Sequence, residues 1–276
     1  GRVPESEWTS MRAPLQAGDF PFPVKYGYCA AGVVEVGPPE WLGKAVFCLH
    51  PHQDRFVAPL AALRPVPEAT PLRRAPLAAN METALNALWD SGAGPGDRVV
   101  VIGAGVLGLF IAYLAARLPG ADVMIVDREA AREGVATALG AKFHRAEAFA
   151  PEAVEADVVF HASATPQGLV LALLSAGFEA TVVETSWHGE GDTPTPLGGA
   201  FHAKRLRLIS SQVGQVSPSR RPRWSYARRL DKALALLADP RLDALITEEI
   251  EFAALPSELP RLLAPGAAGL ATLIRY

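Results

Sequence analysis

The chain has 276 residues, of which 50% are hydrophobic, and a formal net charge of −3. This length can fill one large core or two ordinary ones, and the weakly acidic balance argues against nucleic acid or an anionic membrane as a partner. No apolar run approaches the ~20 residues that cross a bilayer, so we expect no membrane contact. The two cysteines, Cys29 and Cys48, are too few for a disulfide framework or a four-thiolate zinc site, which favours a cytoplasmic location.

The segment before residue 67 is rich in Pro and Gly and has the alternating pattern of short strands. We expect strands at residues 31–37, 45–49 and 55–58, without a helix of any length. The sequence begins at Gly1 rather than Met, and no regular pattern precedes Pro14. We therefore interpret the chain as a fragment that begins in the middle of a loop.

From about residue 75 the pattern changes to alternating helices and strands. We expect helices at residues 77–89, 106–118, 130–139 and 167–175. We expect strands at residues 98–102, 122–127, 157–161, 180–184 and 206–210. Such alternation requires right-handed crossovers, so it predicts an α/β fold with a doubly wound parallel sheet. The tail is expected to add a helix, a strand, a second helix and a last strand, at residues 224–237, 246–252, 255–263 and 270–276.

A glycine-rich segment joins the first strand of this alternation to its helix. Gly103, Gly105 and Gly108 match the pattern G-x-G-x-x-G, with an apolar strand before them and an apolar helix after them. Gly103 permits the tight turn, Gly105 lets a pyrophosphate approach the backbone, and Gly108 lets the helix pack on the strand. The free amides of the first helical turn, which includes Val106 and Leu107, and the positive end of the helix dipole would bind the phosphates. The segment therefore predicts a Rossmann dinucleotide-binding domain.

An acidic residue, Asp127, ends the next strand, about 20 residues after the last glycine. Its carboxylate can accept hydrogen bonds from both ribose hydroxyls of NAD, and it would repel the 2′-phosphate of NADP. Arg128 follows it and Arg132 lies one turn further, so use of NADP stays open. The competing interpretation is that the glycines serve packing alone and that Asp127 caps the next helix.

Several segments resemble the zinc-type alcohol dehydrogenase group of the medium-chain dehydrogenase/reductase superfamily. They are residues 27–37 (GYCAAGVVEVG), 83–88 (TALNAL), 94–103 (GPGDRVVVIG) and 139–141 (LGA). The resemblance implies a GroES-like, β-rich catalytic domain that is split by an inserted Rossmann domain. It places the catalytic domain at residues 1–77 and 215–276 and the Rossmann domain at residues 78–214, with about 50 family residues missing before the chain begins. It also implies a homodimer.

The sequence departs from this group at the positions that bind the family's catalytic zinc. Tyr28 stands at the family's zinc-binding His, Cys29 stands at the Glu beside it, and Ala79 stands at the next zinc ligand, four residues before Thr83. The third ligand would lie in the family residues that precede the chain. A catalytic zinc needs three protein ligands and an open position. The family's four-cysteine structural zinc lobe is also missing from the sequence. We therefore expect no zinc and no other metal, as in the zinc-free quinone and enoyl reductases of the superfamily.

Without zinc, a hydrogen-bond donor must stabilise charge on the substrate oxygen during hydride transfer. Tyr28 is the first candidate because it occupies a family ligand position, although it could equally be a packed aromatic with a locally bonded hydroxyl. His50 and His52 flank Pro51, and they could bind a metal from one face of a strand, line the cleft or lie at the surface. His52 is the second catalytic candidate.

Three polar residues complete the candidate cofactor site. Thr83 matches the family's Thr beside the nicotinamide, and it could also be an ordinary residue of a helix start. Ser163 and Thr185 follow the strands that end at His161 and Glu184. Ligands of doubly wound sheets bind at such strand ends, although polar residues are common there without a ligand.

Together these features indicate an NAD(H)-dependent, zinc-independent oxidoreductase that moves hydride to or from a carbonyl or alcohol of a small-molecule substrate. Two alternatives stay open at this point. The chain could be an NADPH-dependent quinone or enoyl reductase, or a catalytically inactive NAD-binding regulatory module.

Overall fold

The computed structural model describes residues 3–264 and 266–276. The chain divides into two compact units: the first comprises residues up to Met81 together with Tyr226–Tyr276, and the second comprises Glu82–Ser225. Both boundaries lie somewhat later in the chain than those implied by the family resemblance. The first unit is therefore made of two separate segments, and the second is one continuous insertion between them.

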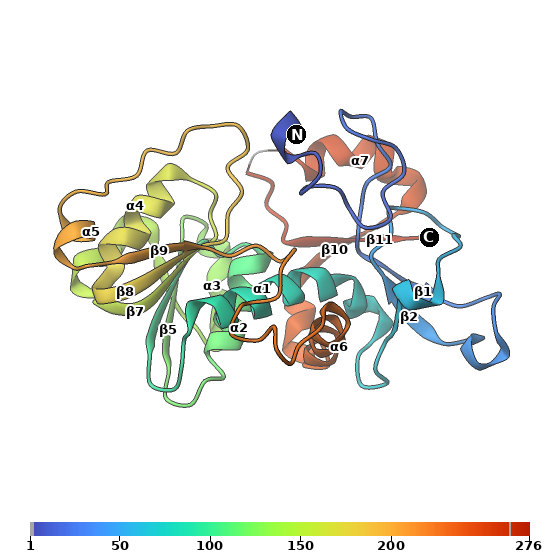
Figure 1. The fold of residues 1–276 in the computed structure, drawn as a ribbon, viewed down its shortest axis with the longest axis horizontal. Coiled ribbons are helices and arrows are strands. Elements are labelled where there is room, and N and C mark those ends of the chain that lie inside the picture. The colour runs from blue at the N-terminus through green and yellow to red at the C-terminus, as the bar shows by residue number, and fades with distance from the viewer. Residues whose placement is uncertain (1–2, 265) are drawn as a thin grey trace. The chain divides into compact units, whose positions relative to one another are not determined.

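The second unit is built on a parallel sheet of six strands in the order β6-β5-β4-β7-β8-β9. Figure 1 labels β5, β7, β8 and β9 of this sheet. The strands are β4 (Arg98–Ile102), β5 (Asp122–Asp127), β6 (Lys142–Arg145), β7 (Ala156–His161), β8 (Ala176–Glu184) and β9 (Arg207–Ser210). The strand order reverses between β4 and β7, which creates the topological switch point at which ligands of doubly wound sheets bind. The predicted α/β doubly wound fold is confirmed.

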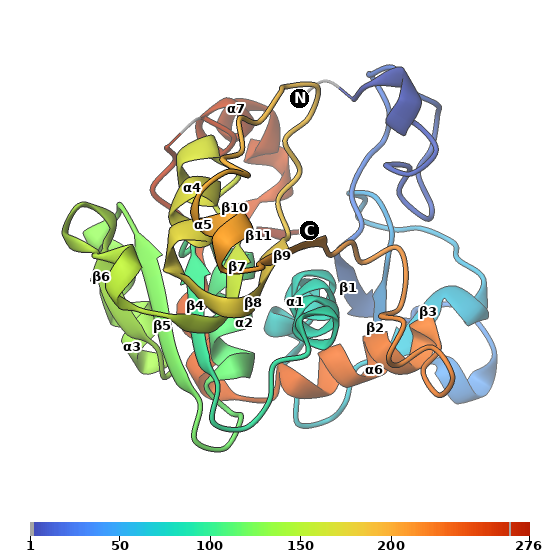
Figure 2. The ribbon, with the colours of Figure 1, turned by 60° about the vertical axis from the view of Figure 1, so that its left-hand side comes forward.

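Helices cover the sheet in two groups (Figure 2). They are α2 (Val106–Ala115), α3 (Glu133–Ala138), α4 (Pro166–Ser175) and α5 (Ala200–Ala203). Helix α2 contacts α3, and α4 contacts α5. Right-handed crossovers in opposite directions from the switch point place these two pairs on opposite faces of the sheet. No helix in the described parts of the chain combines the length and apolar character needed to cross a membrane.

The apolar core of this unit agrees with the apolar sequence patterns from which its central strand and helix were predicted. Val99, Val100 and Val101 of β4 are completely buried, as expected for a parallel strand that is covered on both faces. Helix α2 is apolar on nearly all sides and is buried from Gly108 to Ala115. Burial of an apolar strand and an apolar helix removes a large apolar area from water, which stabilises the folded unit.

The first unit contains two small sheets. Strands β1 (Ala30–Val33), β2 (Ala45–Cys48) and β3 (Leu63–Pro65) form an antiparallel sheet, whereas β10 (Ile246–Glu251) and β11 (Ala271–Arg275) are parallel. Its helices are α6 (Tyr226–Leu236) and α7 (Leu255–Leu262), and helix α1 (Ala78–Ser91) begins in this unit and ends in the second one. The order of helices and strands predicted for the tail is confirmed.

Buried hydrogen bonds join the two chain segments of the first unit. The hydroxyl of Thr70 donates to the carbonyl of Leu234 at 2.9 Å, and the buried guanidinium of Arg74 donates to the carbonyl of Leu237 at 2.6 Å. Arg64 adds a two-pronged ion pair with Asp231 at 2.8 and 2.9 Å. The tail thus completes the first unit, as the split catalytic domain of the resembled family implies.

Three sequence expectations need correction. Residues 55–58 form no strand, and the third strand of the small sheet is β3 instead. Val57 is 99% exposed, so its β-branched side chain has no core to pack against. Strand β6 was not expected, because Lys142 and Arg145 at its ends are exposed and only its middle is partly buried. The first strand is also shorter than residues 31–37, since the chain turns away after Val33.

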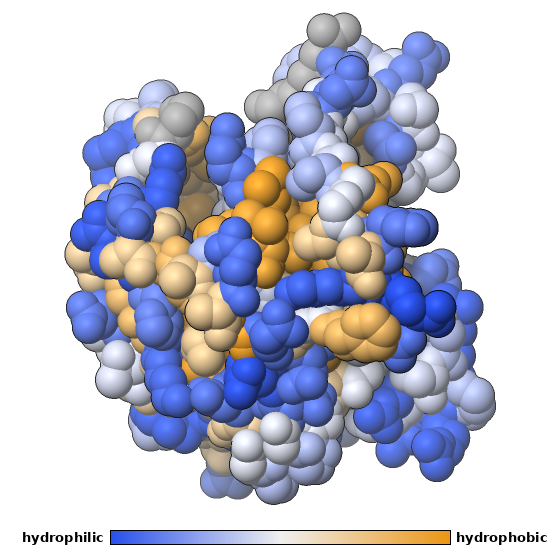
Figure 3. Space-filling model, turned by 90° about the vertical axis from the view of Figure 1, so that its left-hand side faces the viewer, coloured by the Kyte–Doolittle hydropathy of each residue, from blue (hydrophilic) through white to orange (hydrophobic). Residues whose placement is uncertain are grey.

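Hydrophobic side chains also reach the surface of the second unit. Phe178, Trp187 and Leu197 have exposed fractions of 65%, 46% and 51%. Figure 3, which faces the side of the molecule that carries α5 in Figure 1, shows hydrophobic residues among the polar ones. Strand β9 ends the sheet on one side, so its outer edge has no strand partner among the described residues.

Candidate dinucleotide-binding site

The turn after β4 has the geometry that its glycines predict. Gly103 has a φ of +109°, which side chains rarely tolerate, and a Cβ atom there would lie 2.8 Å from the backbone nitrogen of Ser163. The amide of Gly103 donates to the carbonyl of Val126 at 2.8 Å, which ties the turn to β5. Gly103 therefore lets the loops after β4 and β7 approach one another closely.

The other two glycines have opposite surroundings. A Cβ atom on Gly108 would lie 1.8 Å from the carbonyl oxygen of Gly103, so only glycine lets α2 pack at this distance. A Cβ atom on Gly105 would meet nothing within 4 Å, and this residue is exposed. The loop therefore has a tight inner side and an open outer side at Gly105, where a pyrophosphate could rest on the backbone.

The start of α2 provides donors for this open side. The first bond of the helix runs from the amide of Leu109 to the carbonyl of Gly105 at 2.9 Å. The amides of Val106 and Leu107 therefore have no acceptor within the helix, and no side chain caps the helix at Gly105. These amides and the positive end of the helix dipole can bind an anion.

Asp127 lies beside the glycine loop at the end of β5. One carboxylate oxygen accepts a hydrogen bond from the amide of Ala104 at 2.6 Å, and the other accepts one from the amide of Glu129 at 2.8 Å. The side chain is thereby fixed between the loop and the following turn, and it is only partly buried. The next residue, Arg128, is exposed. The structure thus brings the glycines and Asp127 together, as the sequence pattern required.

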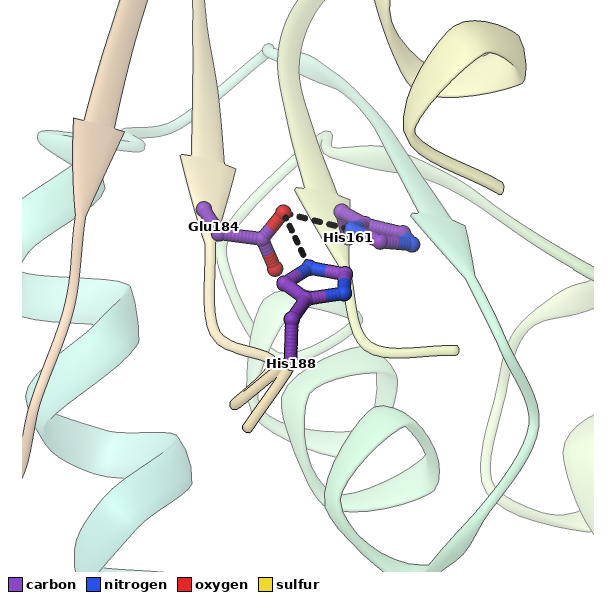
Figure 4. A group of neighbouring side chains, drawn as sticks. All are labelled: His161, Glu184 and His188. Carbon is purple, nitrogen blue, oxygen red and sulfur yellow. Dashed lines mark hydrogen bonds and ion pairs between the residues drawn. The ribbon is translucent and has the colours of Figure 1, made fainter. Parts of the chain in front are cut away.

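A second polar cluster occupies the ends of β7 and β8. The ring nitrogen Nδ1 of His161 lies 2.7 Å from an oxygen of Glu184, and Nε2 of His188 lies 3.4 Å from the same oxygen (Figure 4). Burial of Glu184 raises the pKa of its carboxyl, but hydrogen bonds from His161 and from the amide of Ser186 outweigh this effect, so the net pKa is lowered. The carboxylate is therefore held in its charged form between two imidazoles.

Ser163 and Thr185 lie next to this cluster. The hydroxyl of Ser163 is 2.9 Å from Nε2 of His161 and 3.0 Å from the hydroxyl of Thr165, whereas the hydroxyl of Thr185 donates to the carbonyl of His161 at 2.6 Å. Both hydroxyls thus already have hydrogen-bond partners within the protein. The backbone of Ser163 faces the glycine loop. The expected role of Ser163 in cofactor binding stays a prediction, and it would be carried by the backbone of this residue.

The cluster of His161, Glu184 and His188 was not identified from sequence. Its members come from two strand ends and a loop, so no short spacing marks them as a group. The one available signal was polarity at the carboxyl ends of two buried strands. Thr83, by contrast, lies on α1 and is partly buried there.

The two catalytic candidates lie in the first unit, on adjoining segments. A Cβ atom on Gly27, the residue before Tyr28, would lie 3.1 Å from the ring of His52. The ring of Tyr28 packs edge-on against Tyr26, and burial, with smaller effects of Cys29 and Tyr26, raises the pKa of its phenol. Nδ1 of His52 lies 3.0 Å from the hydroxyl of Tyr276, and although this side chain reaches the surface, desolvation lowers its pKa.

His50 and His52 do not act as a pair. The ring of His50 stacks on Phe56 at 3.6 Å, and its Nδ1 lies 2.8 Å from the carbonyl of Pro51. His52 instead contacts Tyr276. The idea that the two imidazoles share a metal therefore finds no support in their contacts.

The residues at the family's zinc positions do not fit a zinc ion. Tyr28, at the position of the family's histidine ligand, offers a phenol whose pKa is raised by burial instead of an imidazole. Zinc in proteins is bound by thiolate, imidazole or carboxylate groups. Ala79 is buried and offers no ligand atom. No chemical step of this protein is therefore assigned to a zinc at these positions.

Comparisons with known proteins agree with this geometry. A family model described as "Alanine dehydrogenase/PNT, C-terminal domain" matches residues 91–176, which include the glycine loop, Asp127 and strand β7. A zinc-type alcohol dehydrogenase-like protein of Haemophilus influenzae is 29% identical over 217 residues, or 74% of this chain. The matched region spans 59% of that relative's length.

Solved structures of dehydrogenases have a similar fold. Galactitol-1-phosphate dehydrogenase from Escherichia coli superimposes with a TM-score of 0.74 and 17% identity, covering 97% of this chain and 88% of that one. A short-chain alcohol dehydrogenase from Escherichia coli CFT073, complexed with NADH, gives a TM-score of 0.71 and 19% identity and covers 91% of this chain and 83% of its own. The sequence similarity and the shared fold together confirm the resemblance of this chain to the medium-chain dehydrogenase/reductase superfamily.

Proposed function

We propose that the chain carries the cofactor-binding part of an NAD(H)-dependent oxidoreductase that interconverts a carbonyl and an alcohol without the family's catalytic zinc. The observation that carries this proposal is the loop at Gly103, Gly105 and Gly108. A Cβ atom added at Gly103 or Gly108 would lie 2.8 or 1.8 Å from backbone atoms, whereas one added at Gly105, where a pyrophosphate would lie, would meet nothing within 4 Å. A packing role alone would not require the open side at Gly105.

The residues of the chain would act mainly by binding and orientation. The amides at the start of α2 would hold the pyrophosphate, and the carboxylate of Asp127 would accept hydrogen bonds from the ribose. The bound nicotinamide would supply or take up hydride. Tyr28 would donate a hydrogen bond, and during reduction a proton, to the substrate oxygen, with His52 as the neighbouring polar group.

The cofactor is proposed to be NAD rather than NADP. Asp127 presents a negative charge at the position where NADP carries its 2′-phosphate, and it has no donor for that phosphate. Arg128 and Arg132 are the neighbouring residues that favour NADP, and the exposed Arg128 could turn toward a phosphate. This keeps an NADPH-dependent quinone or enoyl reductase as the second candidate.

The test is a titration of the folded chain with NADH and with NADPH, followed by calorimetry or by nicotinamide fluorescence. We expect NADH to bind more tightly than NADPH. Binding of neither cofactor would overturn the proposal. Turnover is then measured with the complete protein on a panel of aldehydes, ketones, quinones and enones, and tight NADH binding without turnover would instead indicate a regulatory module.

A homodimer is also proposed, with β9 as the edge that joins two copies. Its outer edge has unpaired backbone groups, and exposed edges of this kind associate readily. Sedimentation at micromolar concentration would show twice the monomer mass, and a monomer at that concentration would rule this arrangement out.

A further inference from the structure

We propose that His161, Glu184 and His188 form a binding site for a first-row divalent transition-metal ion such as Zn²⁺ at the carboxyl edge of the Rossmann sheet. In the described parts of the chain, these three residues are the group whose potential ligand atoms all lie within 4.8 Å of one another. The site differs in sequence and in location from the family's zinc positions at Tyr28 and Cys29, which belong to the first unit.

The spacing of the ligand atoms is close to what such an ion needs. Bonds of about 2.0–2.2 Å in a tetrahedron place ligand atoms about 3.3 Å apart. Nδ1 of His161 and Nε2 of His188 lie 2.7 and 3.4 Å from the same oxygen of Glu184. Figure 4 shows both rings directed at this carboxylate. A small outward movement of the three groups would admit an ion between them.

Each of the two ligands on the strands is also oriented by a second partner. The other ring nitrogen of His161, Nε2, lies 2.9 Å from the hydroxyl of Ser163. The other oxygen of Glu184 accepts a hydrogen bond from the amide of Ser186 at 2.7 Å. Metal-binding histidines and carboxylates usually have such outer partners, because these fix the tautomer and the direction of the ligand atom.

Burial gives the site a rigid base and an accessible side. The side chain of His161 is 0% exposed, whereas those of Glu184 and His188 are 18% and 19% exposed. The two residues on the strands would need only a small adjustment when an ion arrives, and the residue on the loop would complete the site from the solvent side. Three protein ligands leave the fourth position of a tetrahedral ion to water.

The donor set selects the class of ion. Two imidazoles and one carboxylate suit Zn²⁺ and its first-row neighbours, whereas Mg²⁺ and Ca²⁺ prefer oxygen ligands throughout. The ends of β7 and β8 lie apart from the family's ligand positions and from His50 and His52, to which the expectation of a metal-free protein refers. This proposal does not depend on the proposed oxidoreductase function, because the ion would bind without cofactor or substrate.

The test uses the full chain without an affinity tag, stripped with a chelator and titrated with Zn²⁺ by calorimetry. We expect one ion per chain and a higher melting temperature with Zn²⁺. The variant His188→Ala removes the partly exposed ligand and leaves buried His161 in place, and we expect its Zn²⁺ affinity to fall at least about tenfold. The control His202→Ala, on α5 of the same unit, should bind Zn²⁺ as the parent does.

Substitution with Co²⁺ provides an independent readout, since three-ligand tetrahedral Co²⁺ absorbs visible light strongly and hexa-aqua Co²⁺ does not. The absorption should appear in the parent chain and be lost in His188→Ala. Absence of stoichiometric Zn²⁺ binding, or equal affinity in the parent and His188→Ala, would overturn the proposal. NADH titration of the same samples separates this failure from a failure of the proposed function.

Discussion

The carboxyl edge of the Rossmann sheet and the segment around Tyr28 differ in how far they keep the patterns of the resembled family. At the sheet edge, the glycines of the loop have the close approaches that their pattern predicts, and Asp127 accepts a hydrogen bond from the amide of Ala104. Around Tyr28, a phenol whose pKa is raised by burial stands at the family's histidine ligand, and buried Ala79 stands at the next one. Binding through backbone geometry needs only glycines at a few positions, whereas a metal site is lost when its donor side chains change.

The largest predicted effect is a slow alkylation of Cys29, which tests the burial of the segment around Tyr28. A thiol with a pKa near 12 is almost entirely protonated at pH 8, so we expect iodoacetamide to modify it on the order of a thousandfold more slowly in the native chain than in the urea-unfolded chain. Mass spectrometry of the peptide that contains Cys29 measures both rates. Equal rates would mean that Cys29 is an accessible thiolate, which would contradict its burial beside Tyr28.

A smaller effect is expected from Gly108→Ala. The new methyl group would lie 1.8 Å from the carbonyl oxygen of Gly103, so α2 must move away from the loop. Overpacking of this kind costs about 1–3 kcal/mol, and we expect NADH affinity to fall by about 10–100-fold together with a lower melting temperature.

The matched control for that variant is Gly134→Ala on α3. A methyl group there meets nothing within 4 Å, and alanine is the better helix former. NADH affinity and melting temperature should therefore be unchanged or slightly higher. If both variants bound NADH like the parent chain, the close approach at Gly108 would have no part in cofactor binding.

The smallest effect, and the one that sharpens the choice of cofactor, is expected from Asp127→Asn. Loss of the charged acceptor should reduce NAD affinity by about tenfold, whereas NADP affinity should stay the same or rise because the repulsion is removed. Paired titrations with NADH and NADPH measure the ratio, and Glu133→Gln on the exposed first turn of α3 is the control. Equal losses for the two cofactors would contradict the proposed contact with the ribose.

The sequence predicted the parts of the fold in which a local requirement, either apolar composition or glycine, restricts the residue type. Strand β4 and helix α2 are apolar on all sides, and the glycines between them are required by a positive φ at Gly103 and a close contact at Gly108. Such constraints are local, so they can be read along the chain. Strand β6 escaped prediction because its pairing with β5 compensates for charged residues at both of its ends.

The same distinction between local and tertiary contacts applies to the candidate site. The glycine loop and Asp127 lie on consecutive elements at a known separation, so the sequence indicated them together. The cluster of His161, Glu184 and His188 depends on parallel pairing of β7 with β8 and on the path of the following loop. The segments of Tyr28 and His52 are joined by the close approach of Gly27 to His52 and by a hydrogen bond from the amide of His52 to the carbonyl of Tyr26. Contacts that depend on tertiary structure in this way have no marker in the sequence.

The bonds from Thr70 and Arg74 to the backbone near the end of α6 have a consequence for the order of events on the ribosome. The acceptors of these two side chains are synthesised after the whole inserted unit, so that unit can fold while the first segment is still waiting for its partners. A chain whose synthesis stops before Tyr226 would lack the acceptors of both side chains, so Thr70 and Arg74 would donate to water instead.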